Sequence, residues 1–177
     1  LNPNEAERNQ LFQELVDRLK SPQSFEIDPP EGLQADLRPY QLTGFRWMKM
    51  LSHYGLGGVL ADDMGLGKTI QTITFLLDEK MKGNMTDPAI IIAPASLVYN
   101  WKKELEKFAP QLSVQILTGD PTARQEALNE AAEKDIWITS YPLLRQDITS
   151  YEEQKFHATV LDESQAIKNE TDRKSVV

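Results

Sequence analysis

Residues 61–69 read ADDMGLGKT and end in Gly-Lys-Thr, a set of residue types that can hold the phosphates of a nucleotide. The run GVLAD before the glycines is typical of a buried strand, and KTIQTITFLLDEK after them has the apolar spacing of a helix. That order of strand, glycine loop and helix is what a phosphate-binding loop requires. Asp62 stands where the strict pattern G-x-x-x-x-G-K-[ST] has its first glycine, so the alternative is an ordinary glycine turn before a helix.

Different groups of the expected loop would bind the phosphates and the metal ion. Its backbone N–H groups would point at anionic oxygens, aided by the dipole of the helix that follows. Lys68 would reach the β- and γ-phosphates, and the hydroxyl of Thr69 would ligate Mg²⁺. The predicted phosphate-binding residues are Met64, Gly65, Leu66, Gly67, Lys68 and Thr69.

A second group of candidates lies in ATVLDESQ, where Asp162 and Glu163 follow an apolar run. Ligands of open α/β sheets bind at the carboxyl ends of the strands, so this strand end and the Lys68 loop can meet at one site. Asp162 would hold Mg²⁺, and Glu163 would orient or deprotonate an attacking water. By itself an acid pair after a strand indicates a solvated turn, and it is the loop upstream that favours the catalytic interpretation.

The elements that must position these residues alternate along the chain. Segments with helical spacing separate short apolar or β-branched runs, which occur at 58–60, 89–93, 114–117, 136–139 and 159–161. This alternation predicts an α/β domain with a mainly parallel sheet flanked by helices. Asp120 followed by Pro121 is typical of a helix start and predicts a helix over 122–133.

An N-terminal helical extension is expected before this domain. Residues 5–20 carry apolar side chains at helical spacing, namely Leu11, Phe12, Leu15, Val16 and Leu19. Residues 21–32 are rich in proline, lack periodicity and are typical of a linker. The predicted organisation is therefore a helix and linker over 1–35 and the main α/β domain over 36–177, with the boundary near Ala35.

Composition bounds the class of protein. The 177 residues are 40% hydrophobic and 26% charged, which suits one globular domain with a sizeable core. The absence of cysteine excludes disulfides and thiolate metal sites and favours an intracellular setting. A net charge of −8 argues against binding nucleic acid by bulk electrostatics, so any DNA contact must be local. A start at Leu1 and an apolar end at Val176-Val177 indicate a piece of a longer protein.

Five segments together resemble the SWI/SNF-related helicase-like ATPases of helicase superfamily two. They occur in that family's order and are LRPYQLTGFRWM (37–48), LADDMGLGKTIQ (60–71), IIAPASLVYNWKKEL (91–105), ITSYPLLRQD (138–147) and LDESQAIKN (161–169). The resemblance implies a first RecA-like lobe whose loop resembles D-E-M-G-L-G-K-T, so the first glycine of the strict pattern is not required. Because two carboxylates would repel a triphosphate, we expect Asp62 and Asp63 to turn away from it.

The resemblance also implies roles for single residues. Gln41 would read the adenine of ATP, with Arg38 and Tyr40 framing the base. Two of the segments resemble motifs that touch the DNA backbone, a sequence-independent contact. The DNA-binding residues implied are Ser96, Asn100, Trp101, Thr139 and Ser140, with capping of the next helix as the alternative for Ser96 and Thr139. Gln165 stands where many relatives carry histidine and would still hydrogen-bond toward the γ-phosphate.

An activity, cofactors and partners follow from the same resemblance. The whole protein would be an ATP- and Mg²⁺-dependent translocase on double-stranded DNA that remodels protein–DNA complexes, in the cytoplasm, nucleoid or nucleus. The family's site lies between two RecA-like lobes, and arginines of the second lobe stabilise the transition state, so this piece alone should be nearly inactive. Two alternatives stay open, a phosphotransferase that uses the same loop and a non-catalytic ATP-binding interaction module. The two histidines, His53 and His157, are expected to be structural.

Overall fold

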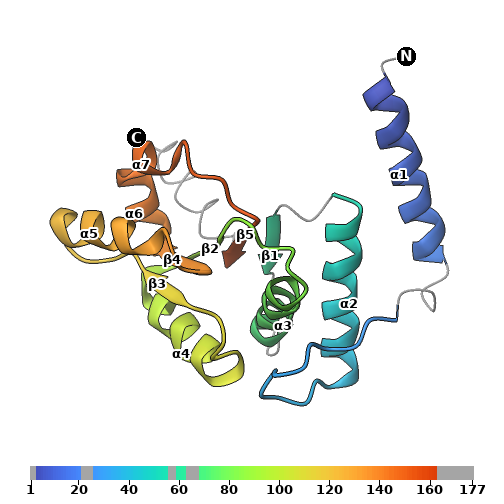
Figure 1. Cartoon of the computed structure of the whole chain (residues 1–177), viewed down its shortest axis with the longest axis horizontal. Helices are drawn as coiled ribbons and strands as arrows, with labels where there is room; N and C mark the ends of the chain where they lie inside the picture. Colours follow the sequence, from blue (N-terminus) through green and yellow to red (C-terminus); the bar gives the residue numbers. More distant parts are fainter. Residues whose placement is uncertain (1–2, 21–25, 56–58, 63–67, 163–177) are drawn as a thin grey trace, which may run out of the picture.

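The computed structural model describes residues 3–20, 26–55, 59–62 and 68–162 (Figure 1). At its centre is a sheet of five parallel strands in the order β1-β5-β2-β4-β3. The strands are β1 (Val59–Asp62), β2 (Ala89–Ala93), β3 (Val114–Ile116), β4 (Ile136–Ser140) and β5 (Ala158–Asp162). These are the five runs expected to be strands, and the predicted α/β class is confirmed.

Helices connect the strands and cover both faces of the sheet. They are α1 (Pro3–Lys20), α2 (Pro39–His53), α3 (Lys68–Met81), α4 (Val98–Phe108), α5 (Pro121–Ala131), α6 (Tyr141–Gln146) and α7 (Ile148–Tyr151), with a short 3₁₀ turn at Ala95–Leu97 before α4. The start predicted for α5 is confirmed, because Asp120 caps the helix by accepting a hydrogen bond of 2.8 Å from the Ala123 N–H. The helix expected over 122–133 ends slightly earlier, at Ala131.

The apolar core lies in two layers, one on each face of the sheet. Ala89, Ile91 and Ala93 of β2 belong to the layer beneath α2, α3 and α4. Ile90 and Ile92 belong to the layer that contacts α5 and α7. Figure 1 shows α3 and α4 on one side of the strands and α5, α6 and α7 on the other. A strand whose successive side chains are buried on both faces explains the unbroken apolar run AIIIA.

Helix α2 packs closely along α3. A Cβ atom on Gly44 would overlap the side-chain oxygen of Gln71, so only glycine fits at this position of α2 without displacing Gln71. The two helices meet start to start at this contact, and end to end where Ser52 donates a hydrogen bond of 3.0 Å to Glu79. These two contacts indicate that the helices run in the same general direction.

The N-terminal helix contacts the lobe through a small apolar cluster. Leu15 of α1 packs with Met50 and Tyr54 near the end of α2. Residues expected to be linker also pack on the lobe, since Ile27 and Leu33 lie against the core beneath α2, α3 and α4. The domain boundary near residue 35 stays a prediction. Among the described helices, none has the length and apolar character needed to cross a membrane.

Candidate nucleotide-binding site

The sheet brings together the two strand ends assigned to one site. Strands β1 and β5 are parallel neighbours in a register that pairs Asp62 with Asp162. The glycine loop begins after Asp62, and α3 begins at Lys68. The phosphate loop and the acid motif therefore start from adjacent positions at the carboxyl edge of the sheet, where α/β proteins bind ligands.

Part of the expected site lies outside the described residues. This applies to Asp63, to the loop residues Met64, Gly65, Leu66 and Gly67, and to Glu163 and Gln165. The side chains of Lys68 and Asp62 lie outside them as well. The roles given to these residues, and the expectation that both aspartates turn away from the phosphates, stay predictions.

Asp162 is buried and held in a defined orientation. It is 9% exposed, and its Oδ2 accepts a hydrogen bond of 2.7 Å from the indole Nε1 of Trp101. Its backbone carbonyl accepts a second bond, of 2.6 Å, from the hydroxyl of Tyr141. No local sequence pattern indicates either contact, because both join residues that lie far apart along the chain.

The donor set at this point fits a hard cation. Mg²⁺ prefers oxygen ligands and keeps several from water or phosphate, and the Asp162 carboxylate and the Thr69 hydroxyl are oxygen ligands of this kind. Thr69 is half-buried in the first turn of α3. No group of three or more acidic or histidine side chains in the described ranges could hold a metal ion. A cation here would need nucleotide or water oxygens to complete its shell.

The residues expected to read the base lie at the start of α2. Gln41 is buried, and its Oε1 accepts a hydrogen bond of 2.8 Å from the backbone N–H of Arg38, which closes the first turn of the helix. Arg38 and Tyr40 are exposed. Because α2 and α3 run in the same direction, this end of α2 lies at the same end of the molecule as Thr69.

Three of the five residues expected to contact DNA have buried side chains. Trp101 is 2% exposed and points to Asp162 rather than to solvent. Thr139 is 1% exposed and donates its hydroxyl to the Leu117 carbonyl at 2.9 Å, so this hydroxyl is not on the surface and does not cap a helix. Ser140 is also buried and accepts from the Leu143 N–H at 3.5 Å, as the N-cap of α6. The reason is that β4 is covered on both faces to its last residue.

The other two expected contacts are on the surface. Ser96 and Asn100 are both exposed, in the 3₁₀ turn and first turn of α4 that follow β2. Ser96 does not cap α4, since no side chain caps either the turn or the helix. Tyr99 between them is largely exposed, with its hydroxyl 3.3 Å from that of Thr118 after β3. Neither Tyr99 nor Thr118 is among the residues expected to contact DNA.

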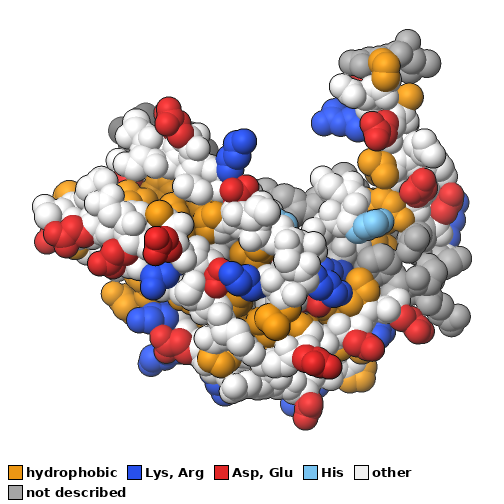
Figure 2. Space-filling view, in the orientation of Figure 1, with side chains coloured by type: hydrophobic (Ala, Val, Ile, Leu, Met, Phe, Trp, Pro, Cys, Tyr) orange, Lys and Arg blue, Asp and Glu red, His pale blue; other side chains and the backbone are white. Residues whose placement is uncertain are grey.

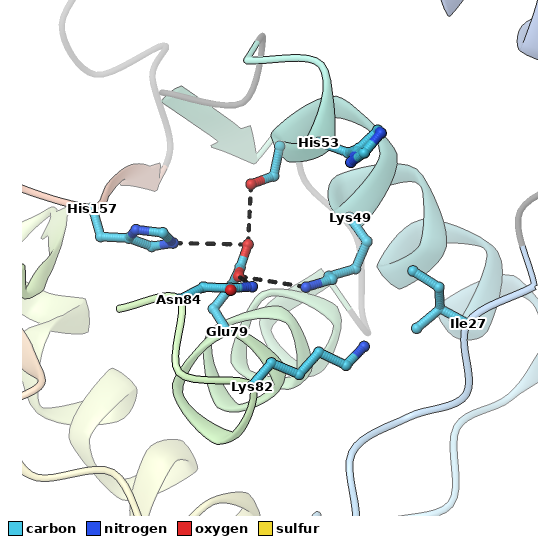
Figure 3. A pocket seen from close by; sticks show the side chains of 8 residues that line it. Ile27, Lys49, His53, Glu79, Lys82, Asn84 and His157 are labelled. Atoms are coloured by element: carbon cyan, nitrogen blue, oxygen red, sulfur yellow. Dashed lines mark hydrogen bonds and ion pairs between the residues drawn. The ribbon is translucent and has the colours of Figure 1, made fainter. Parts of the chain in front are cut away.

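A cavity of about 360 Å³ lies elsewhere, at the other end of α2 and α3. Figure 3 shows Lys49, Asn84 and His157 pointing at Glu79, which is buried. Asn84 donates to Glu79 at 2.6 Å, and Nε2 of His157 lies 3.7 Å from its other oxygen. Burial acts to raise the pKa of Glu79, but these polar contacts together lower it below its ordinary value. The cavity lies near the amino ends of the strands and is separate from the nucleotide site.

Comparisons with known proteins agree with this arrangement. A family model described as the SNF2-related domain matches residues 40–176. An "Uncharacterized ATP-dependent helicase" of Mycoplasma pneumoniae is 45% identical over 135 residues, which are 76% of this chain and 13% of that protein. Helicase SWR1 of Yarrowia lipolytica is 38% identical over 157 residues, 87% of this chain and 9% of that protein.

A solved structure is also similar. The Sulfolobus solfataricus SWI2/SNF2 ATPase core in complex with dsDNA superposes with a TM-score of 0.70 and 41% identity, over 82% of this chain and 29% of that chain. The chain thus spans under a third of the solved core and about a tenth of the curated relatives described above.

Proposed function

This chain belongs to the SNF2-related domain family, and we propose that it is the ATP-binding lobe of a DNA-dependent ATPase that translocates on double-stranded DNA and remodels protein–DNA complexes. The fold is that of the first RecA-like lobe of such a core. The observation that carries the proposal is the register of β1 and β5, which sets the phosphate-loop strand beside the buried Asp162. Relatives named as helicases and chromatin-remodelling ATPases support it.

In this function the chain's residues bind and activate the triphosphate. Lys68 and the loop N–H groups would hold the β- and γ-phosphates. Thr69 and Asp162 would hold Mg²⁺, which when bound would supply positive charge beside the phosphate oxygens. Glu163 accepts a proton from a water molecule while the oxygen of that water attacks the γ-phosphorus. The bond from that phosphorus to the β–γ bridging oxygen breaks, and ADP and phosphate leave. Gln165 hydrogen-bonds near the γ-phosphate.

Base selection belongs to the start of α2. The Oε1 of Gln41 is engaged by the Arg38 N–H, and its amide NH₂ would donate to the adenine edge. Tyr40 and Arg38 flank the base from the exposed side. Near this end of α2, Gly44 lies directly against the side chain of Gln71 on the phosphate-loop helix.

DNA contact belongs to the surface around α4. Ser96 and Asn100 offer polar groups suited to phosphate oxygens, which carry no sequence information. On the face seen in Figure 2, acidic and basic side chains are interspersed, in keeping with a net charge of −8. Binding by this lobe is therefore local and weak, and a second RecA-like lobe is proposed to supply further contacts and the arginines that complete the site.

The test is an ATPase assay on the natural full-length protein with no DNA, single-stranded DNA or duplex DNA. We expect duplex-stimulated hydrolysis of ATP and displacement of a triplex-forming strand from a duplex, which reports translocation. The 177-residue chain assayed in parallel should bind Mg·ATP weakly and show almost no turnover. Phosphate transfer to an acceptor other than water, or turnover that ignores duplex DNA, would refute the proposal.

A further inference from the structure

Aromatic side chains from two helices hold Asp162. The indole N–H of Trp101 on α4 donates to its carboxylate, and the hydroxyl of Tyr141, the first residue of α6, donates to its carbonyl. One bond orients the side chain and the other anchors the main chain. A carboxylate oxygen that accepts one hydrogen bond keeps lone pairs for a cation, so the indole orients Asp162 without blocking it.

The proposed function places the start of α4 near DNA. Helix α4 follows β2 and carries the exposed Asn100 directly before the buried Trp101. Helix α6 follows β4 and begins directly after the buried Ser140. Asp162 is therefore joined by one hydrogen bond to the helix expected at the DNA and by a second to the helix that follows β4.

Trp101 cannot move independently of α4. It belongs to the core cluster that also contains Leu105 of the same helix and Ile138 of β4. Because protein interiors are close-packed, a displacement of α4 carries the indole with it. The N–H that Asp162 accepts would be displaced by the same movement.

We propose that Trp101 and Tyr141 are positioning residues that couple the DNA-facing segments to the metal ligand Asp162. The inference rests on the proposed function, in which Asp162 holds Mg²⁺ and α4 lies against DNA. DNA that secures α4 also secures the geometry of Asp162 through Trp101, with Tyr141 holding the main chain, and Mg²⁺-dependent nucleotide binding tightens. By linkage, bound Mg-nucleotide strengthens DNA binding by the same factor.

The test uses Trp101→Phe and Tyr141→Phe in the natural full-length protein. Each variant keeps an aromatic ring and removes one hydrogen-bond donor. The lobe offers matched controls. Trp137→Phe removes a buried indole N–H that donates to the Ala131 carbonyl at 2.7 Å, and Tyr151→Phe removes a buried hydroxyl that hydrogen-bonds with Thr139.

The readout is equilibrium binding of a fluorescent, non-hydrolysable ATP analogue over a series of Mg²⁺ concentrations, with and without duplex DNA. Trp101→Phe should raise the Mg²⁺ concentration needed for half-maximal binding about tenfold, as expected for losing a hydrogen bond to a charged group. The affinity for the nucleotide in the absence of Mg²⁺ should stay unchanged. The increase in nucleotide affinity that duplex DNA causes should become smaller. Tyr141→Phe should also raise the half-maximal Mg²⁺ concentration and reduce the effect of DNA, but by smaller amounts than Trp101→Phe. The two control variants should match the wild type in both measurements.

The outcomes separate the inference from the proposed function. A wild type without Mg²⁺-dependent nucleotide binding would refute the proposed function itself. A wild type that binds, with Trp101→Phe indistinguishable from Trp137→Phe, would overturn only the coupling. Equal weakening with and without Mg²⁺ would reveal a merely structural role and overturn it too. If thermal unfolding shows that Trp101→Phe does not fold, the same measurements on Tyr141→Phe, compared with its control Tyr151→Phe, decide the question.

Discussion

The ammonium nitrogen of Lys49 on α2 lies 2.7 Å from Oδ2 of Asp78 on α3, and both side chains are buried. The same nitrogen lies 3.4 Å from Oε2 of Glu79. Buried charges depend on their partners, because removing one leaves an uncompensated charge in a medium of low dielectric. This ion cluster ties the two helices together at the end away from the nucleotide site.

Replacing Lys49 with methionine should therefore destabilise the lobe. The change keeps most of the side-chain volume and removes the buried cation shared by the two carboxylates, leaving Asp78 with only the half-exposed Lys82 at 3.1 Å. The free energy of unfolding should fall by up to about 3 to 5 kcal/mol. Urea denaturation of the lobe measures this. Lys102→Met is the control, since its nitrogen lies 3.9 Å from Glu106 on the surface and such pairs contribute about 1 kcal/mol or less. Equal losses in the two variants would contradict the role given to the cluster.

Stability at acid pH should depend on Glu79. Its folded pKa lies below the ordinary value of 4.5, so the unfolded state binds the proton more readily. The stabilisation is complete above the unfolded pKa and is lost as the pH falls through the folded pKa. Glu79→Gln should make the decline of unfolding free energy below about pH 4.5 shallower. Glu152 is exposed, so Glu152→Gln should keep the wild-type decline. If the free energy of unfolding of Glu79→Gln falls with pH as steeply as that of the wild type, Glu79 does not make this contribution.

Two substitutions of Gln41 separate capping from base reading. Gln41→Glu keeps an acceptor for the Arg38 N–H but loses the amide donor, whereas Gln41→Ala loses both. Both should reduce the preference for ATP over GTP about tenfold, the cost of an unpaired buried polar edge. Only Gln41→Ala should lower the free energy of unfolding, by about 0.5 to 2 kcal/mol. Competition binding measures this preference. If Gln41→Glu still prefers ATP over GTP as the wild type does, Gln41 does not contact the base.

Two loop and acid-motif variants of the full-length protein should fail in different ways. Lys68→Ala removes the cation on the β- and γ-phosphates, so both ATP binding and DNA-stimulated hydrolysis should be lost. Glu163→Gln keeps the shape of the side chain but takes no proton, so ATP should bind while hydrolysis fails. Binding assays beside single-turnover kinetics distinguish the two. Equal loss of binding would show that the roles are misassigned.

Local signals predicted much of this fold. Asp120 caps α5 as expected because a cap depends only on the next few residues. The apolar runs became strands because each could be buried on one or both faces. The strand-end rule also placed Asp162 beside the phosphate-loop strand, since ligand sites of parallel sheets gather at one edge.

Local sequence patterns did not predict which way single side chains point. Thr139 and Trp101 belong to motif segments near the expected DNA surface, yet both side chains are buried. Position in a segment does not tell which way a side chain points, because that depends on which helices cover each face. The bond between Trp101 and Asp162 joins residues 61 positions apart, and no local pattern reports such a contact.

Gly44 leaves room on α2 for the side chain of Gln71. A methyl group there would overlap the end of that side chain near the start of α3, while the contacts of Glu79 hold the far ends of the two helices together. The Gln71 amide would therefore have to turn away from α2. A change on α2 would thus be absorbed by one side chain of the neighbouring helix, three residues beyond Lys68.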